Sequence, residues 1–299
     1  MIDLVVAGTI GLDDIETPFG RVHHVIGGSA IYASIAASFF AKPGIISIAG
    51  VDLPESNYHL LRSRSIDISG VAIDEKTFRW SGLYEFDMNE AKTLKTKLNC
   101  VTKFNPKLPE SYKGAKFLFL ANINPVIQKQ VLDQMEEKPF VLLDTMNYWI
   151  ENKKSALTKI IKRCDLLLLN DSEARQLFDS PNLVKAARLA LQLGPKYVVI
   201  KKGEHGALLF SKDAHFSAPG YPLENTMDPT GAGDSFAGAL AGYLAKVCKT
   251  DELSLRRGIV FASAIASFCA EDFSTRRLLK LKYGEIEERY EIFKKIREF

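Results

Sequence analysis

The chain has 299 residues, of which 46% are hydrophobic and 25% charged, enough for one large α/β domain with a buried core and a small appendage. Its 39 basic and 36 acidic residues give a formal net charge of +3 and are spread along the chain, which argues against a nucleic-acid partner. Four cysteines without a Cys-x-x-Cys pair indicate neither a zinc cage nor a disulfide framework. We find no signal-peptide pattern and no membrane-spanning stretch, and we expect a cytoplasmic protein.

Short apolar runs bounded by turn residues alternate with longer segments of helical period, a pattern that predicts βα units around a parallel sheet. One run consists of four leucines without polar alternation, so we expect it near the middle of the sheet with helices on both faces. The predicted strands in chain order are Leu4–Ala7, Ile45–Ala49, Phe117–Ala121, Phe140–Asp144, Leu166–Leu169 and Tyr197–Lys201.

Two segments, residues 13–26 and about 71–105, interrupt this rhythm, because polar and apolar residues alternate there as in half-exposed antiparallel strands. Phe78–Phe86 is the clearest example. We expect both segments to form one small sheet that projects from a single domain spanning residues 1–299. Such a sheet is either a lid, whose closure excludes water from a substrate, or a hairpin without a role in binding.

The chain after Thr230 is mainly helical in pattern. Apolar residues of the last segment fall on one helical face amid charges, which favours docking of that helix onto its own domain. The predicted helices are Ser235–Lys246, Leu253–Ala270 and Glu285–Arg297.

Glycines just before the first of these helices indicate a tight turn and a helix start at Ala232 or Gly233. The free N–H groups at such a helix start, together with the positive end of the helix dipole, form a cradle for phosphate. Asp234 would lie in the first turn beside that phosphate, where a base for a substrate hydroxyl is needed. An ordinary helix N-terminus with an acidic first turn is the alternative for this segment alone.

The same segment resembles the motif Asp-Thr-x-Gly-Ala-Gly-Asp of the ribokinase-like, or PfkB, family of carbohydrate kinases, and only Pro229 departs from it. The resemblance implies a ribokinase-like three-layer α/β/α domain with a mostly parallel central sheet and a small β-sheet lid. It implies ATP and Mg²⁺ as cofactors, with a monovalent cation such as K⁺ as a further candidate. It also implies that Asp234 is the general base, that Asp228 lies on the nucleotide side, and that the anion hole consists of Gly231, Ala232 and Gly233.

Gly27, Gly28 and Ser29, followed by a helix of small residues, resemble the family's N-terminal motif for substrate binding. Paired glycines let a ligand approach the backbone closely, although a close-packed helix start explains them equally well. Asp13 matches the family aspartate that binds substrate hydroxyls, and Asp14 is a neighbour that could be confused with it.

Asn170 and Glu173 follow the all-leucine strand and resemble the family's Asn-x-x-Glu motif, which implies contacts with Mg²⁺ and phosphate partly through water. Oxygen ligands suit magnesium, and a helix capping box is a structural alternative that is compatible with it. Lys201, Gly203 and Gly206 resemble the family's strand and glycine turn beside the nucleotide. Many relatives have a threonine at the position of Lys201, so its ammonium either contacts phosphate or is simply solvated.

The positions of these residues agree with one another without the family. Asp13 closely follows the first strand, and Asn170 and Lys201 lie at or near the carboxyl ends of two others, which is the edge where open α/β sheets bind ligands. A Rossmann dehydrogenase would require Gly-x-Gly-x-x-Gly after the first strand, and a P-loop kinase would require Gly-x-x-x-x-Gly-Lys-Ser/Thr; the chain has neither. A non-catalytic regulator on the same fold is disfavoured by the intact Asp234 within its glycine loop.

We therefore predict an ATP-dependent kinase for a hydroxyl of a sugar or sugar derivative, with a nucleoside such as adenosine as the alternative acceptor. Thr77–Trp80 offers an aromatic surface and Arg79 a partner for a carboxylate or phosphate, although lid packing explains the aromatic side chains equally well. Asn147 follows another predicted strand and is a further candidate for the substrate pocket. An exposed lid edge could pair with a second copy and form a homodimer.

Overall fold

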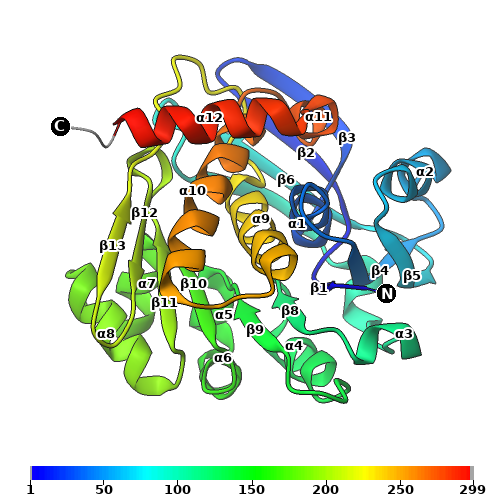
Figure 1. The fold of residues 1–299 in the computed structure, drawn as a ribbon. Coiled ribbons are helices and arrows are strands. Elements are labelled where there is room, and N and C mark those ends of the chain that lie inside the picture. The colour runs from blue at the N-terminus through cyan, green and yellow to red at the C-terminus, as the bar shows by residue number, and fades with distance from the viewer. Residues whose placement is uncertain (1, 297–299) are drawn as a thin grey trace.

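The computed structural model describes residues 2–296, and within them two β-sheets form the framework (Figure 1). The larger sheet has nine strands in the order β13-β12-β11-β10-β9-β8-β1-β4-β5. The pairs from β11 to β5 are parallel, and β12 and β13 add antiparallel strands at one edge. The strands are β1 (Leu4–Ala7), β4 (Pro43–Gly50), β5 (Asp67–Asp74), β8 (Phe117–Leu120), β9 (Phe140–Leu143), β10 (Leu166–Asn170), β11 (Tyr197–Lys201), β12 (Ala207–Phe210) and β13 (His215–Ala218).

All six predicted strands are confirmed, and the all-leucine strand β10 lies next to β9 at the centre of the sheet. Side chains along a strand alternate between faces, so each strand serves two hydrophobic layers. In β10, Leu166 and Leu168 belong to one core cluster, whereas Leu167 and Leu169 belong to the other. Helices therefore cover both faces, which gives the predicted three-layer α/β/α arrangement of the ribokinase-like fold.

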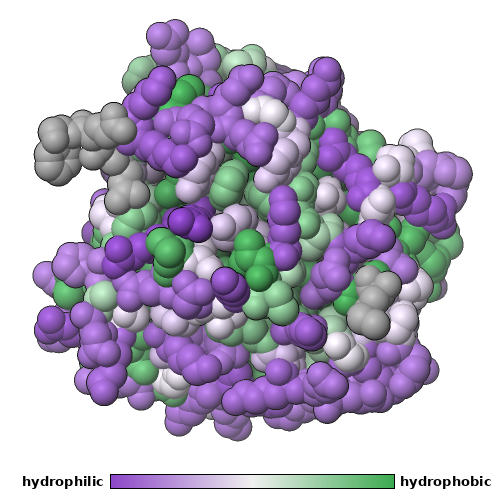
Figure 2. Space-filling view, in the orientation of Figure 1, coloured by the Kyte–Doolittle hydropathy of each residue, from purple (hydrophilic) through white to green (hydrophobic). Residues whose placement is uncertain are grey.

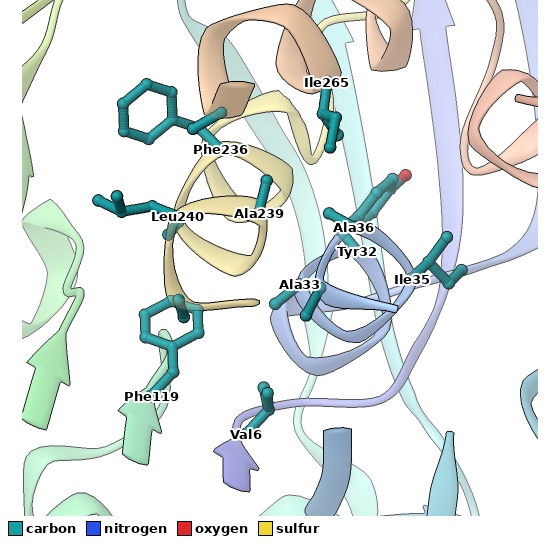
Figure 3. Close-up of a cluster of buried hydrophobic side chains, with 14 of the residues drawn as sticks. Val6, Tyr32, Ala33, Ile35, Ala36, Phe119, Phe236, Ala239, Leu240 and Ile265 are labelled. Atoms are coloured by element: carbon teal, nitrogen blue, oxygen red, sulfur yellow. The ribbon is translucent and has the colours of Figure 1, made fainter. Parts of the chain in front are cut away.

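The helices divide between the two faces according to these clusters. One face carries α1 (Ser29–Ala37), α2 (Glu55–Ser63), α9 (Ala232–Val247), α10 (Glu252–Cys269), α11 (Arg276–Lys280) and α12 (Tyr283–Ile296). The other carries α3 (Glu110–Lys113), α4 (Pro125–Leu132), α5 (Asn147–Asn152), α6 (Lys154–Ile161), α7 (Asp171–Phe178) and α8 (Leu183–Leu193). Figure 3 shows side chains of α1 and α9 meeting those of β1 and β8 in the first of these layers.

The three predicted C-terminal helices are present as α9, α10 and α12, and α12 is anchored by the buried Ile286 and Phe293, as the helical pattern predicts. Arg297, the predicted end of the last helix, lies outside the described residues. None of the helices described between residues 2 and 296 combines the length and apolar character needed to cross a membrane. On the face seen in Figure 2, most side chains are hydrophilic and apolar ones are scattered among them.

The smaller sheet is the lid, with strands in the order β3-β2-β6-β7. The pairs β2–β3 and β6–β7 are antiparallel, whereas β2 and β6 run parallel. Its strands are β2 (Gly11–Thr17), β3 (Gly20–Gly27), β6 (Phe78–Tyr84) and β7 (Ala91–Lys97), and the short 3-10 helix η1 (Asn99–Lys103) follows.

The predicted extent of the lid is wrong at one end, because Val71–Asp74 belongs to β5 of the larger sheet. The alternation in that stretch has a different physical origin, since β5 is an edge strand whose residues are mostly half-buried or exposed. An edge strand of a covered sheet and a strand of a projecting sheet give the same polar and apolar pattern.

Candidate active site

The glycine loop starts α9 where the sequence predicts. Gly231 is the N-cap, with a φ of 77°, and the helix begins at Ala232. A side chain at position 231 would be strained by that φ, and its Cβ would lie 2.3 Å from the ring of Tyr32. The Ala232 N–H donates to the Pro229 carbonyl at 3.1 Å, so part of the loop's hydrogen-bonding capacity is used within the turn itself.

Asp234 lies in the first turn of α9 and is half-buried. Burial, reinforced by the neighbouring Asp144 carboxylate, raises the pKa of Asp234 to about 7, and the Lys201 ammonium opposes this shift. A carboxyl group with this pKa can both accept and release a proton near neutral pH, which suits a general base.

Asp13 lies on β2 of the lid, next to a register shift in its pairing with β3, and is buried. Its carboxylate occupies the space beside Gly27, because a Cβ there would lie 1.8 Å from Asp13 Oδ2. Burial first, and then the charges of Asp228, Asp234 and Asp14, raise the pKa of Asp13 to about 8. The Gly28 N–H donates to it and opposes that shift, so the predicted glycine pair and Asp13 form one unit.

Asn170 and Lys201 are register partners at the carboxyl ends of β10 and β11, as predicted. Asn170 and Glu173 form the capping box of α7: Asn170 N–H donates to Glu173 Oε2, and Glu173 N–H donates to Asn170 Oδ1, each at 2.7 Å. Burial raises the pKa of Glu173 to about 8 although Lys201 opposes the shift.

The polar atoms of Asn170 and Glu173 are thus partly committed to each other, which fits a Mg²⁺ ion held through water better than one bound directly. Within residues 2–296 no group of three or more His, Cys, Asp or Glu residues could hold a metal ion by itself.

Lys201, which is predicted to lie beside the nucleotide, forms a buried ion pair. Its ammonium lies 2.7 Å from Asp144 Oδ2, and only 16% and 4% of the two side chains are exposed. Burial alone would lower the pKa of Lys201, but the charges of Asp144, Glu173 and Asp234 outweigh it and raise that pKa, so the ammonium is charged. The same Nζ lies 3.5 Å from the position a Cβ would take at Gly233.

Gly203 and Gly206 bracket the short turn η2 (Gly203–His205) between β11 and β12, with φ values of 54° and 83°. A Cβ at Gly206 would lie 2.1 Å from the Ala218 carbonyl oxygen, so this turn requires glycine there. A Cβ at Gly203 would lie 3.2 Å from Asn89 Oδ1, which brings the tip of the lid hairpin to the predicted nucleotide side.

Two predicted site residues have polar atoms engaged inside the protein. Ser29 Oγ donates to the Asn122 carbonyl at 2.9 Å and accepts from Thr9 N–H at 3.0 Å. Asp228 is fully buried, and its two oxygens accept from the N–H groups of Thr230 and Ser274, each at 2.9 Å. These contacts hold the loops of the site, and direct ligand contacts by Ser29 and Asp228 remain predictions.

The remaining predicted substrate residues are Arg79 and Asn147. Arg79 on β6 donates to Asp52 Oδ2 at 3.1 Å, so its guanidinium already has a carboxylate partner. Asn147 begins α5 and is exposed, with its side-chain oxygen accepting from Tyr148 N–H at 2.8 Å. Arg79 is not among the charged neighbours that shift the pKa of Asp234.

Two contacts between residues of the site were not predicted, although the segment that begins with Asp144 was a candidate for the pocket. Asp144, at the end of β9, pairs with Lys201 from 57 positions further along the chain. Tyr84 of the lid accepts a hydrogen bond from Thr230 Oγ1 at 3.3 Å, so the lid touches the glycine loop. The only sequence signal for Asp144 is its place at the carboxyl end of a predicted strand, because nothing local indicates its partner.

The geometry and the motifs agree with a comparison to protein families, since a model of the pfkB family carbohydrate kinases matches residues 2–281. The chain belongs to this family. Among sequence relatives of this PfkB protein, the cytidine kinase of Thermococcus kodakarensis is 33% identical over 252 residues, covering 81% of this chain and 89% of the relative. The nucleoside kinase of Methanothermobacter thermautotrophicus is 26% identical over 268 residues, covering 87% and 83%.

Solved structures give the same fold for the PfkB chain. The aminoimidazole riboside kinase of Salmonella enterica, crystallised with aminoimidazole riboside and an ATP analogue, superposes with a TM-score of 0.78. The alignment covers 96% of this chain and 99% of that one at 17% sequence identity. At that identity the similarity establishes the ribokinase-like fold, including the lid, and not the substrate.

Proposed function

We propose that this protein is an ATP-dependent nucleoside kinase that transfers the γ-phosphoryl group of ATP to a hydroxyl of the nucleoside's ribose. The observation that carries the proposal is the position of Asp234, in the first turn of α9 beside the glycine loop, with a pKa raised to about 7. Two of the sequence relatives, a cytidine kinase and a nucleoside kinase that each match over more than 80% of this chain, support a nucleoside acceptor over the free sugar that the motifs alone favour.

The reaction requires few protein groups. Asp13, held by Gly27 and Gly28, orients the acceptor through its hydroxyls, and Asp234 takes the proton of the attacking hydroxyl. The acceptor oxygen forms a bond to the γ-phosphorus while the bond from that phosphorus to the bridging oxygen breaks, and the electron pair stays on ADP. The N–H groups of the glycine loop oppose the charge on the transferred group.

Mg²⁺ would neutralise the phosphate oxygens of ATP when bound, with Asn170 and Glu173 holding its water shell. A monovalent cation remains a prediction from the family resemblance. So does a homodimer through the lid, whose edge strand β7 is exposed along almost its whole length.

An acceptor panel with Asp234→Asn as the control tests this function. With ATP and Mg²⁺, we expect the wild-type protein to phosphorylate cytidine or another nucleoside with a higher kcat/KM than ribose or fructose. Asp234→Asn should lower kcat by about 10²- to 10⁴-fold, because the acceptor proton loses its base, while the affinity for an ATP analogue stays within threefold.

Each outcome distinguishes a specific alternative. A higher kcat/KM with a free sugar would contradict the nucleoside assignment and restore the sugar kinase. Unchanged turnover in Asp234→Asn would remove Asp234 as the base. A wild-type protein that binds nucleoside and ATP yet transfers no phosphate to any acceptor would be the non-catalytic regulator.

A further inference from the structure

The ion pair between Lys201 and Asp144 is buried, and its desolvation costs free energy that apolar side chains at the same positions would not. Taking two charges out of water is expensive, and replacing a buried pair by apolar side chains of similar size is often neutral or stabilising. This pair lies 2.7 Å apart with both side chains almost covered, at the sheet edge where the acceptor and nucleotide would meet. A buried pair of charges at such an edge is a candidate for a functional site.

The lysine is aimed at the glycine loop. β11 ends at Lys201, and its Nζ comes within 3.5 Å of the space beside the Gly233 Cα. An ammonium has three donors. One of them donates to Asp144, so two remain for phosphate oxygens that enter between the glycine loop and the end of β11.

Asp144 is held rigidly in turn. Its Oδ1 accepts from the Thr145 N–H at 2.9 Å, and its backbone carbonyl accepts from Gln128 Nε2 at 3.0 Å. The carboxylate therefore fixes the lysine stem in one direction, and the ammonium has little rotational freedom to lose when a phosphate arrives.

We propose that Lys201 is a catalytic residue whose ammonium contacts the phosphoryl group during transfer, and that Asp144 is the positioning residue that aims it. The assignment rests on the proposed kinase function. In it, Lys201 supplies a fixed positive charge to the anion hole, where the loop contributes N–H dipoles and where the Ala232 N–H is already shared with Pro229.

The two partners of this ion pair also shift the pKa of the proposed base, Asp234, in opposite directions. Four charged groups face Asp234 or its neighbours from separate elements: Asp144 from β9, Glu173 from α7, Lys201 from β11 and Asp13 from β2. Lys201 lowers the pKa of Asp234, whereas Asp144 raises it. Removing either partner therefore changes that pKa with a different sign, which loss of structure alone would not do.

Three variants and one control test the assignment. Lys201→Met should lower kcat by about 10²- to 10³-fold, the loss typical of an anion-hole donor, and move the acid limb of the kcat/KM profile to higher pH. Asp144→Asn should reduce kcat less and move that limb to lower pH. Lys196→Met is the matched control, because Lys196 pairs with Asp165 at 3.2 Å just before the start of the same strand and is exposed; its kinetics should match the wild type.

The double variant Lys201→Met with Asp144→Asn leaves neither partner of this ion pair as an unpaired buried charge, so it tests the lysine even where the single variant fails to fold. We expect its kcat to stay as low as that of Lys201→Met while the acid limb returns toward the wild-type position. A kcat within threefold of wild type in either lysine variant overturns the catalytic role. Acid limbs that move in the same direction in both single variants overturn the charge argument.

These outcomes separate the two proposals. Loss of turnover in Asp234→Asn together with full turnover in Lys201→Met removes only the role of Lys201. Absence of phosphoryl transfer by the wild-type protein to any acceptor removes the kinase function on which that role rests.

Discussion

The missing side chain of Gly27 leaves room for the carboxylate of Asp13, which is proposed to bind the acceptor. A Cβ at this position would lie 1.8 Å from Asp13 Oδ2 and 2.6 Å from Asp13 Cγ, so Gly27→Ala must displace the carboxylate. We expect a loss in kcat/KM for the acceptor of up to about 100-fold, because a 1 Å misplacement of an orienting group is enough for that. The affinity for an ATP analogue should not change.

Gly114→Ala is the matched control for this variant. No heavy atom lies within 4 Å of a Cβ at Gly114, and its φ is negative, so its kinetics should remain those of the wild type. Steady-state kinetics on both variants gives kcat/KM for the acceptor, and calorimetry gives the affinity for the ATP analogue. Equal kcat/KM in Gly27→Ala and wild type would show that the Asp13 carboxylate does not bind the acceptor.

Single residues were predictable where a motif is local and unpredictable where a partner is distant. Asp234 and Gly231 stand within four positions of each other, so the sequence contains both the proposed base and its turn. Ser29 is predicted as a ligand contact, and the sequence gives no sign that its hydroxyl also donates to a carbonyl 93 positions away. The pairing of Asp144 with Lys201 is likewise a product of the fold and has no local signal.

At the scale of elements, the proposed base Asp234 is positioned by the contact between α9 and α1. A Cβ at Gly238 would lie 2.2 Å from the Ala33 carbonyl oxygen, and one at Gly242 would lie 2.7 Å from that of Ala37. The two helices, which lie side by side in Figure 3, thus meet backbone to backbone. Any side chain at these glycines must push α9, and with it Asp234, away from α1.

We expect Gly238→Ala to lower the free energy of unfolding by about 1–3 kcal/mol, the usual cost of overpacking, and to lower kcat as well. Gly242→Ala should have a smaller effect on both quantities, since its Cβ has more room. Gly284→Ala in α12, where no heavy atom lies within 4 Å, is the control and should have almost no effect. Urea denaturation and kcat measurements on the three variants test this account. It would be contradicted if Gly284→Ala had the largest effect and Gly238→Ala the smallest.

Hydrophobic period predicted the strands and helices of the larger sheet because burial on one or two faces dictates that period directly. The same signal could not separate the lid from β5, since both are half-exposed. It also could not show that β2 and β6 run parallel, because the direction of pairing between segments more than 60 positions apart leaves no trace in either one.

For the molecule as a whole, folding gathers acids that the chain keeps far apart. Asp13 comes from the lid, Glu173 from α7 and Asp234 from α9, and burial is the main cause that raises the pKa of each of them. In the unfolded chain these carboxyl groups are solvated and separated. The folded protein without ligands therefore holds protons that the unfolded chain releases.

This proton uptake fixes the sign of a stability change with pH. The pKa values of Asp13 and Glu173 are raised to about 8 and that of Asp234 to about 7, whereas the unfolded values are 3.8 for Asp and 4.5 for Glu. Between about pH 4 and pH 8 the folded state binds more protons than the unfolded state, so the free energy of unfolding falls as the pH rises. Each acid contributes at most about 1.4 kcal/mol per pH unit.

We therefore expect the ligand-free protein to have a higher Tm at pH 6 than at pH 8.5, and Asp13→Asn and Glu173→Gln each to flatten that slope. Asp251→Asn is the control: Asp251 caps α10 with its pKa lowered by hydrogen bonds from Ser254, so it titrates below this window, and asparagine caps a helix equally well. Thermal unfolding of the four proteins across this range tests the prediction. A Tm that rises from pH 6 to pH 8.5 would mean that the gathered carboxyl groups are ionised in the folded state, and the electrostatic basis for a base poised near neutral pH would be lost with it.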